Sequence, residues 1–369
     1  MASSLTQSDV ARLLAEPSAS VRAEVAGKLA GDIDNPQLTD SELQIAHDVV
    51  RIMAKDVEMA VRLALSHSLR SATRLPHDVA VRLANDVEAV AQPILTESPV
   101  LTDADLIEIV QHGSAKKQEA IAVRAGVSEY LADALISSAG EIAVAALMGN
   151  ATAHIGDQSL DKAVDRFAHS DRVKAGMVHR EHLPVTIAER LVVMVSERLK
   201  AYLVSHHELP ASLATDVVLQ SRERATLHLS HGSSQQDLER LLAQMHRHDR
   251  LTPFLVLRAV CLGDMAFFET AMAVLAKVPV RNARILIHDA GPKGLTSLYE
   301  KSGMPPRLLP AVRVAVDVVR GTEFDGGERD HERYRSRVIT RILTQFEDLP
   351  QEDIDYLLDK LGDVLTVAA

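Results

Sequence analysis

Four arginines near the end of the chain have the type and spacing of residues that bind a phosphate group. Each is four residues from the next, so on a helix they would share one face. A guanidinium offers a planar fork of N–H donors, which matches the oxygens of a phosphate or carboxylate. The pattern predicts a site for a small anionic ligand such as a cyclic dinucleotide, with the candidate residues Arg329, Arg333, Arg337 and Arg341.

The acidic residues that follow these arginines offer a different explanation. They are close enough in sequence to pair with the arginines within the chain, and we favour this pairing over ligand binding. Leucines and an isoleucine lie between the acids in an amphipathic pattern. The segment is therefore either the last core helix, which we favour, or a docking helix for a partner. The acids are Glu347, Asp348, Glu352, Asp353, Asp355 and Asp359.

The residues that usually bind metals form no recognised motif here. The chain has sixteen histidines but one cysteine, and no His-Glu-x-x-His sequence. We expect no metal, no cofactor, and histidines that cap helices or face solvent. Cys261 lies in the apolar run 255–262, which predicts a small buried side chain rather than a nucleophile. The close histidine pairs are His179 and His182, His206 and His207, His228 and His231, and His246 and His248.

The segment Gly291–Thr296, Gly-Pro-Lys-Gly-Leu-Thr, resembles a phosphate-binding loop in composition only. A P-loop has four residues between its first glycine and the Gly-Lys-Ser/Thr, and it follows a strand. Neither condition holds, so the segment is predicted to be a turn between helices. With no nucleophile, base or metal set in evidence, we expect no enzyme. A helical-repeat DNA glycosylase is the enzymatic alternative, and the net charge of −11 and the absence of Trp disfavour it.

These side chains would be carried by a repeat of helices, and its clearest mark is a Val-Arg dipeptide. Among the occurrences of this dipeptide, those that begin at positions 21, 61, 81 and 123 follow one another in steps of 40, 20 and 42 residues. A period of about 40 is typical of stacked helix pairs of the HEAT or armadillo kind. We expect the valine to face the neighbouring helix and the arginine to reach a carboxylate. Asp56 and Asp78 lie where a helix-starting carboxylate would also complement the helix dipole.

The rest of the chain is predicted to be helical as well. Leu-Pro precedes apolar segments at positions 75, 183 and 209, and proline is well placed in the first turn of a helix. No segment shows the sustained alternation that a strand requires. The predicted helices include a pair over 38–68, one over 76–90 that ends before Pro93, three-turn helices between 237 and 319, and two closing helices over 332–346 and 351–365.

The expected fold is all-α, with a HEAT/armadillo-like helical-repeat solenoid followed by a compact helical unit. Glycine and serine interrupt the helical pattern at 231–234, which predicts a linker there. Residues 1–230 would then form the repeat region and residues 235–369 the compact C-terminal domain. The long apolar helices over 184–204 and 210–229 are expected to form a hairpin between the two.

Two segments resemble recurring sequences of a known family. One is Arg180–Leu191, with Arg-Glu-His-Leu-Pro before Ile-Ala-Glu-Arg-Leu, and the other is Arg258–Glu269. They are similar to an uncharacterised alphaproteobacterial family of HEAT-like helical proteins, a family of unknown function. The similarity extends over most of the chain. It implies a bacterial, cytoplasmic helical-repeat protein and supplies no catalytic residues.

Composition narrows the classes of partner. Only 3% of the 369 residues are aromatic, and a general nucleic-acid binder needs a net basic face, so nucleic acid is not an expected partner. The first residues lack a secretory pattern, and no run of 18 apolar residues occurs, so the cytoplasm is the expected compartment. We expect a non-enzymatic protein–protein interaction scaffold or adaptor in bacterial signalling, because repeat stacks present long binding surfaces. The alternative is a regulatory sensor that binds a small anion through the 329–341 arginines.

Overall fold

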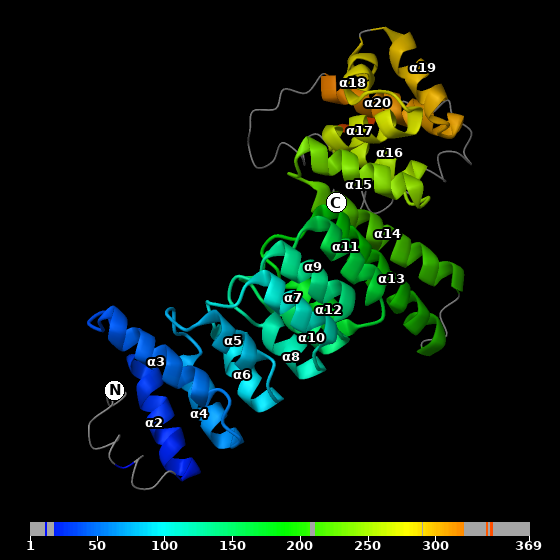
Figure 1. Ribbon diagram of the computed structural model, residues 1–369. Helices are drawn as coiled ribbons and strands as arrows, with labels where there is room; N and C mark the ends of the chain where they lie inside the picture. The colour runs from blue at the N-terminus through cyan, green and yellow to red at the C-terminus, as the bar shows by residue number, and fades with distance from the viewer. Residues whose placement is uncertain are drawn as a thin grey trace. The chain divides into compact units, whose positions relative to one another are not determined.

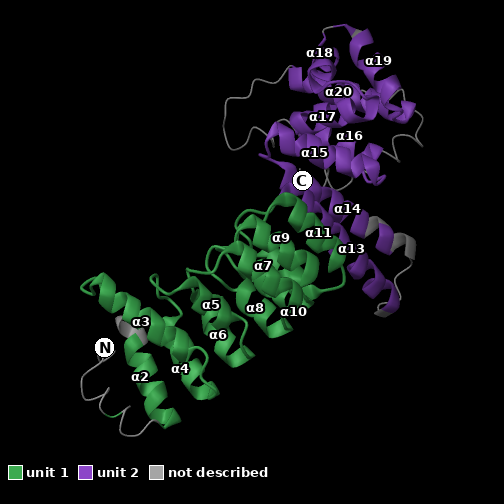
Figure 2. Ribbon diagram, viewed as in Figure 1, with its two compact units in different colours: residues 1–183 green, residues 184–369 purple. Residues whose placement is uncertain are grey.

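The computed structural model describes residues 12, 18–206, 211–289, 291–320, 337–338 and 340–341. Every regular element in these ranges is a helix, which confirms the all-α helical-repeat fold (Figure 1). The chain divides into two compact units, residues 1–183 and residues 184–369 (Figure 2).

In the first unit the helices form two rows (Figure 1). Each helix of the first row packs against the next one in that row, and α7, α9 and α11 do the same in the second row. The first row consists of α2 (Ala19–Asp32), α4 (Met59–Leu69), α6 (Glu88–Glu97), α8 (Ala115–Ala122), α10 (Glu141–Gly149) and α12 (Asp171–Val178). The second row consists of α3 (Asp40–Met53), α5 (His77–Ala84), α7 (Asp103–His112), α9 (Glu129–Ser138) and α11 (Asp157–Arg166).

The starts of the first-row helices set the repeat length. The step from α2 to α4 is 40 residues, and the later steps are 29, 27, 26 and 30 residues. Val21 and Val61 therefore occupy equivalent positions, and both are buried. Beyond this step the predicted period of about 40 is wrong. Val81 lies on α5 in the second row, and Val123 follows α8 and is 49% exposed. The helices of the first unit that follow α3 have 8–11 residues, whereas α2 and α3 have 14, so each later repeat is shorter.

The arginines of the two equivalent Val-Arg pairs bind carboxylates of the following repeat. Arg22 donates from Nε to Asp56 Oδ2 at 2.7 Å and from Nη2 to Oδ1 at 3.1 Å. Arg62 binds Asp86 in the same way, at 2.6 and 3.0 Å. Both aspartates lie just before the next first-row helix, so each arginine joins one repeat to the next. Asp78, the other aspartate expected at a helix start, lies in the first turn of α5.

Later repeats are joined by side chains that bind the carbonyl end of the preceding first-row helix. Nη2 of Arg124 donates to the Ser98 carbonyl at 2.7 Å, just after α6. Asn150 donates to two carbonyls at the end of α8, and Arg180 to carbonyls at and after the end of α10. The last carbonyls of a helix have no partner within it, so these bonds satisfy them.

One predicted helix end is wrong. The segment expected to be a single helix over 76–90 is two helices, α5 and α6, and α6 continues through Pro93 to Glu97. A proline inside a helix removes one backbone hydrogen bond. Val90, Ile94 and Leu95 on the same helix are fully buried, so packing in this unit outweighs that loss.

The second unit begins with two long helices, α13 (Val185–His206) and α14 (Ala211–Ser230), which pack against each other as the expected hairpin. The remaining helices surround α17, which contacts α15, α16, α18 and α19. Phe267 and Phe268 of α17 are fully buried in this core. The elements after the hairpin are α15 (Gln235–Arg247), α16 (Pro253–Cys261), α17 (Met265–Ala276), α18 (Val280–His288), α19 (Pro292–Ser302), the 3₁₀ turn η1 (Pro306–Leu308) and α20 (Leu309–Arg320).

The division between the units falls between Leu183 and Pro184. The segment 231–234, where the glycine and serine pattern predicts a linker, is a short turn between α14 and α15. The hairpin therefore groups with the C-terminal helices rather than with the repeats. Leu227 near the end of α14 belongs to the same buried core as Leu238 and Leu241 of α15, which accounts for this grouping.

Candidate functional site

The predicted arginine site lies largely outside the described residues. Arg329 and Arg333 are among the residues that the structure does not describe. Arg337 and Arg341 are helical and exposed. The grouping of these four arginines into one anion site stays a prediction.

The Gly-Pro-Lys-Gly segment is the start of a helix. Gly291 is the N-cap residue of α19 and Pro292 is its first residue, so the segment is the first part of a helix that follows α18, and the predicted turn over 291–296 is wrong. The second glycine has a packing role, because a Cβ at Gly294 would lie 2.7 Å from the carbonyl oxygen of Leu286 on α18. Close contact between α18 and α19 therefore explains this glycine without a phosphate.

Two other expectations concern metals and the cysteine. In the ranges given above, no three His, Cys, Asp or Glu side chains come together as a metal site would require. Cys261 is buried at the end of α16, as predicted, and burial raises the pKa of its thiol to about 12. No helix among those described is long and apolar enough to span a membrane.

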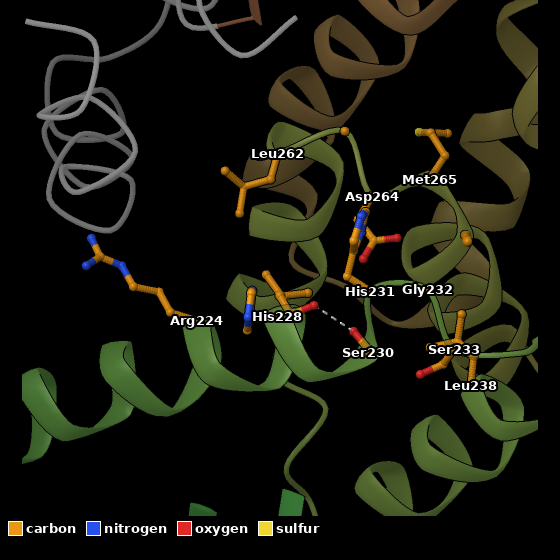
Figure 3. A pocket seen from close by; sticks show the side chains of 13 residues that line it. Arg224, His228, Ser230, His231, Gly232, Ser233, Leu238, Leu262, Asp264 and Met265 are labelled. Atoms are coloured by element: carbon orange, nitrogen blue, oxygen red, sulfur yellow. Dashed lines mark hydrogen bonds between the residues drawn. The ribbon is translucent and has the colours of Figure 1, made fainter. Parts of the chain in front are cut away.

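A cavity of about 690 Å³ lies within the second unit (Figure 3). It is lined by the last two turns of α14, the turn at 231–234, Leu238 of α15 and residues 262–266 between α16 and α17. We call it the α14 pocket. Its volume is within the range of small-molecule sites, roughly 300–1,000 Å³.

Three basic side chains form one wall of the α14 pocket. Arg224 and His228 lie on exposed positions of α14, and His231 follows its last residue. The backbone N–H of His231 donates to the Leu227 carbonyl at 3.1 Å, so the helical geometry continues through this position. Spacings of four and three residues place the three side chains within about 60° of one another around the helix axis.

The remainder of the lining is mainly apolar. Leu227, Leu238, Leu262 and Met265 contribute aliphatic or thioether side chains, and none of the lining residues that the structure describes is aromatic. Among the described lining residues, the carboxylate is that of Asp264, which serves as the N-cap of α17 and accepts a hydrogen bond from the Phe267 N–H at 3.0 Å.

A buried ion pair sets the orientation of α14 beside the pocket. Glu223, next to Arg224 in sequence, is buried and accepts a hydrogen bond from Thr252 Oγ1 at 2.8 Å. Its other oxygen lies 3.5 Å from Nε of the buried Arg258 on α16. Glu223 therefore links α14 to α16 inside the unit.

A second surface lies on α13, where large apolar side chains are exposed. Val195, Leu199 and Tyr202 are 62, 51 and 52% exposed, and their spacing of four and three residues places them on one side of the helix. We call this surface the α13 face. Arg198 and Lys200 stand about 100° to either side of Leu199 around the helix axis.

Neither surface is predicted by the sequence pattern. His228 and His231 are one of the close histidine pairs in the sequence, and Arg224 belongs to no predicted site. Their four- and three-residue spacing was the available signal, but the facing segment at 262–266 follows a different helix. The exposure of the α13 face could not be inferred, because an apolar stripe is the same in sequence whether it is covered or not.

The fold is that of an all-α helical-repeat protein with an appended helical unit. Residues 90–350 match a family described as an uncharacterised protein conserved in bacteria, DUF2336, and the chain belongs to that family. The matched range contains both the α14 pocket and the α13 face. Comparisons with curated proteins and with solved structures found no match.

Proposed function

We propose that the protein is a non-enzymatic scaffold of the bacterial cytoplasm that binds a partner protein on the α13 face. The observation that carries this proposal is the exposure of Val195, Leu199 and Tyr202 on one side of a 22-residue helix. Helical-repeat proteins are commonly used as binding surfaces, and the two-row stack supports this class of function. The HEAT-like assignment and the alphaproteobacterial origin belong to the same proposal.

The shape of the α13 face suits a helical partner. Apolar residues spaced by four and three along one helix form a stripe that an amphipathic helix can pack against. Tyrosine is enriched among the residues that dominate binding energy at interfaces, because it offers a large rigid area at a small entropic cost. Tyr202 at one end of the stripe is therefore the expected anchor.

The charges beside the stripe specify the partner's chemistry. Arg198 and Lys200 flank Leu199 on its two sides, and Glu197 lies on the opposite side of α13, 3.7 Å from Arg222 of α14. Two copies of α13 packed antiparallel about Leu199 would bring like charges together. The surface is better matched by an amphipathic helix with acidic residues beside its apolar stripe. Residues 347–361 of this chain have such a sequence, but they lie outside the described residues.

The test uses two synthetic helical peptides with the same leucine stripe, one flanked by glutamates and the other by lysines. Fluorescence anisotropy with the full chain should show binding of the acidic peptide and binding at least about tenfold weaker for the basic one. Leu199→Ser combined with Tyr202→Ser should weaken binding by about tenfold or more. Ile142→Ser, at an exposed apolar position in the first unit, should leave it unchanged.

Three results would overturn the proposal. The first is no binding of the acidic peptide, and the second is equal binding of both peptides. The third is a dimer of the chain that light scattering detects and that Leu199→Ser with Tyr202→Ser dissociates, because a second copy would then occupy the α13 face.

A further inference from the structure

We propose that a pocket in the first unit binds a compact polar dianion. The pocket has a volume of about 570 Å³ and lies where α3 and α5 end, and we call it the α5 pocket. This inference does not depend on the α13 face. It differs in place from the alternative expectation, which assigns a cyclic dinucleotide to the arginines at 329–341. The pocket precedes residues 90–350, the range that matches the family.

The three aspartates of the described lining are each bound by an arginine. In each pair, Nε and Nη2 of the arginine donate to different carboxylate oxygens, at 2.6–3.3 Å. Both oxygens are engaged, so these acids do not neutralise the other cations of the lining. The pairs are Arg22–Asp56, Arg51–Asp78 and Arg62–Asp86.

Two further cations of the lining have no acidic partner. Lys55 follows the end of α3, Arg82 lies on α5, and both are exposed. In the part of the chain that the structure describes, neither forms an ion pair, and the side chain of Arg82 forms one hydrogen bond, from Nε to the Ala54 carbonyl at 3.2 Å. The ammonium of Lys55 and both Nη groups of Arg82 can therefore donate to a ligand.

The bond to Ala54 determines how the two cations are arranged. It holds the guanidinium of Arg82 at the peptide group that joins Ala54 to Lys55. Because the bond uses Nε, the Nη1 and Nη2 groups remain, and together they fit two oxygens of a carboxylate or phosphate. The ammonium of Lys55 adds a second positive charge from the neighbouring helix. Two cations without acidic partners favour a dianion over a monoanion.

The lining also limits the body of the ligand. Seven of the nine described lining residues have charged or amide side chains, and the other two are Ala54 and Val81. An alkyl chain would therefore find little apolar surface to contact. The volume is within the range of small-molecule sites, roughly 300–1,000 Å³. A short dicarboxylate or a small phosphomonoester meets both conditions.

A cation is the opposite possibility, because the ends of α3 and α5 carry partial negative charge. The Ala54 carbonyl, however, already accepts from Arg82, and the Val81 carbonyl accepts from the Asn85 amide at 3.0 Å. A hard cation would need carboxylate oxygens that the arginines already hold. Among the described residues, no three His, Cys, Asp or Glu side chains are grouped to hold a metal. The pocket therefore favours an anion.

Isothermal titration calorimetry with the full chain tests the proposal, in a buffer of low ionic strength without phosphate. The probes are glutarate, glycerol 3-phosphate, acetate and the dication putrescine. We expect at least one of the two dianions to bind at least tenfold more tightly than acetate, and putrescine not to bind. The ranking of glutarate against glycerol 3-phosphate distinguishes a dicarboxylate from a phosphomonoester ligand.

Variants locate the binding. Lys55→Gln and Arg82→Gln should each weaken binding of the dianion by about tenfold. Lys55→Gln removes no ion pair and should leave the melting temperature unchanged, so it remains informative if Arg82→Gln destabilises the chain. Arg172→Gln, on an exposed position of α12 outside the described lining, is the matched control and should bind like the wild type.

Four results would overturn the proposal. The first is that neither dianion binds, and the second is that acetate or putrescine binds as tightly as the better dianion. The third is that Lys55→Gln binds like the wild type. The fourth is that Arg172→Gln weakens binding as much as Lys55→Gln, because the effect would then reflect the net charge of the chain rather than the α5 pocket.

Discussion

The carboxylate of Glu189 on α13 is bound by Nη1 of Arg250, at 2.9 Å to one oxygen and 2.8 Å to the other. The two residues are 61 positions apart in sequence, and Glu189 is 1% exposed. Arg250 follows α15, so the ion pair joins the α13–α14 hairpin to the helices that follow it. Burial raises the pKa of Glu189, and the charge of Arg250 opposes that rise.

Arg250→Gln should therefore destabilise the second unit. It removes the positive charge and leaves a buried carboxylate, which costs about 3 kcal/mol or more in the free energy of unfolding. Urea unfolding at pH 7.5, followed by circular dichroism, measures this cost. Replacing both partners, with Glu189→Gln added, should recover most of the loss because no buried charge then remains.

The same variant should show a specific pH dependence. A raised carboxyl pKa contributes stability that is present below the unfolded value and is lost as the pH rises through the folded value. Without Arg250 the pKa of Glu189 rises further, so the variant should lose less stability at pH 5 than at pH 8. An equal loss of stability at pH 5 and at pH 8 would contradict this pH dependence of Glu189.

The Arg22–Asp56 pair should make the first unit sensitive to acid. The hydrogen bond from Arg22 is the main cause that lowers the pKa of Asp56. A lowered carboxyl pKa contributes stability above the unfolded value, and this is lost as the pH falls through the folded value. Asp56→Asn should lower the melting temperature at pH 7 and have little effect near pH 2. Asp48→Asn, which removes a largely exposed carboxylate, should change it much less at either pH.

Cys261 should be protected from thiol reagents in the folded protein. Only the thiolate is nucleophilic, and burial raises the pKa of this thiol to about 12. Reaction with a chromogenic disulfide should therefore follow the unfolding transition as urea is added. Complete modification within minutes in native buffer would show that α16 opens readily and would contradict this packing.

Gly176 should be required for the contact between α12 and α10. A Cβ at this position would lie 2.7 Å from Met148 Cβ and 3.1 Å from the backbone nitrogen of Gly149. Gly176→Ala should cost about 1–3 kcal/mol of unfolding free energy, measured by urea titration. Gly149→Ala is the matched control, because nothing lies within 4 Å of a Cβ there, and it should be neutral or stabilising.

The helices were predictable because their signals are local. Proline and serine starts, glycine ends and apolar spacing define most of the observed helices to within a few residues. The repeat length was not predictable. The Val-Arg pairs at 81 and 123 lie at different positions in their repeats from the pairs at 21 and 61. The helix end predicted before Pro93 is also wrong. Whether the helix continues depends on the buried side chains around Pro93, and these are far apart in sequence.

Both candidate surfaces required the three-dimensional structure. Arg224 and His228 become a pocket wall only because Leu262 and Met265 face them across a turn. The α13 face is a binding candidate because Leu199 stays exposed while Leu191 on the same helix is buried. Sequence periodicity identifies both leucines as apolar helix positions. It does not show which of the two is buried and which is exposed.

Hydrogen exchange of the full chain with and without the acidic helical peptide tests the central claim most directly. If the α13 face binds a partner helix, added protection should appear in fragments that contain residues 192–205 and be absent from α7 and α9 in the first unit. The protection should disappear in the chain with Leu199→Ser and Tyr202→Ser. Protection elsewhere, with none on α13, would contradict the account.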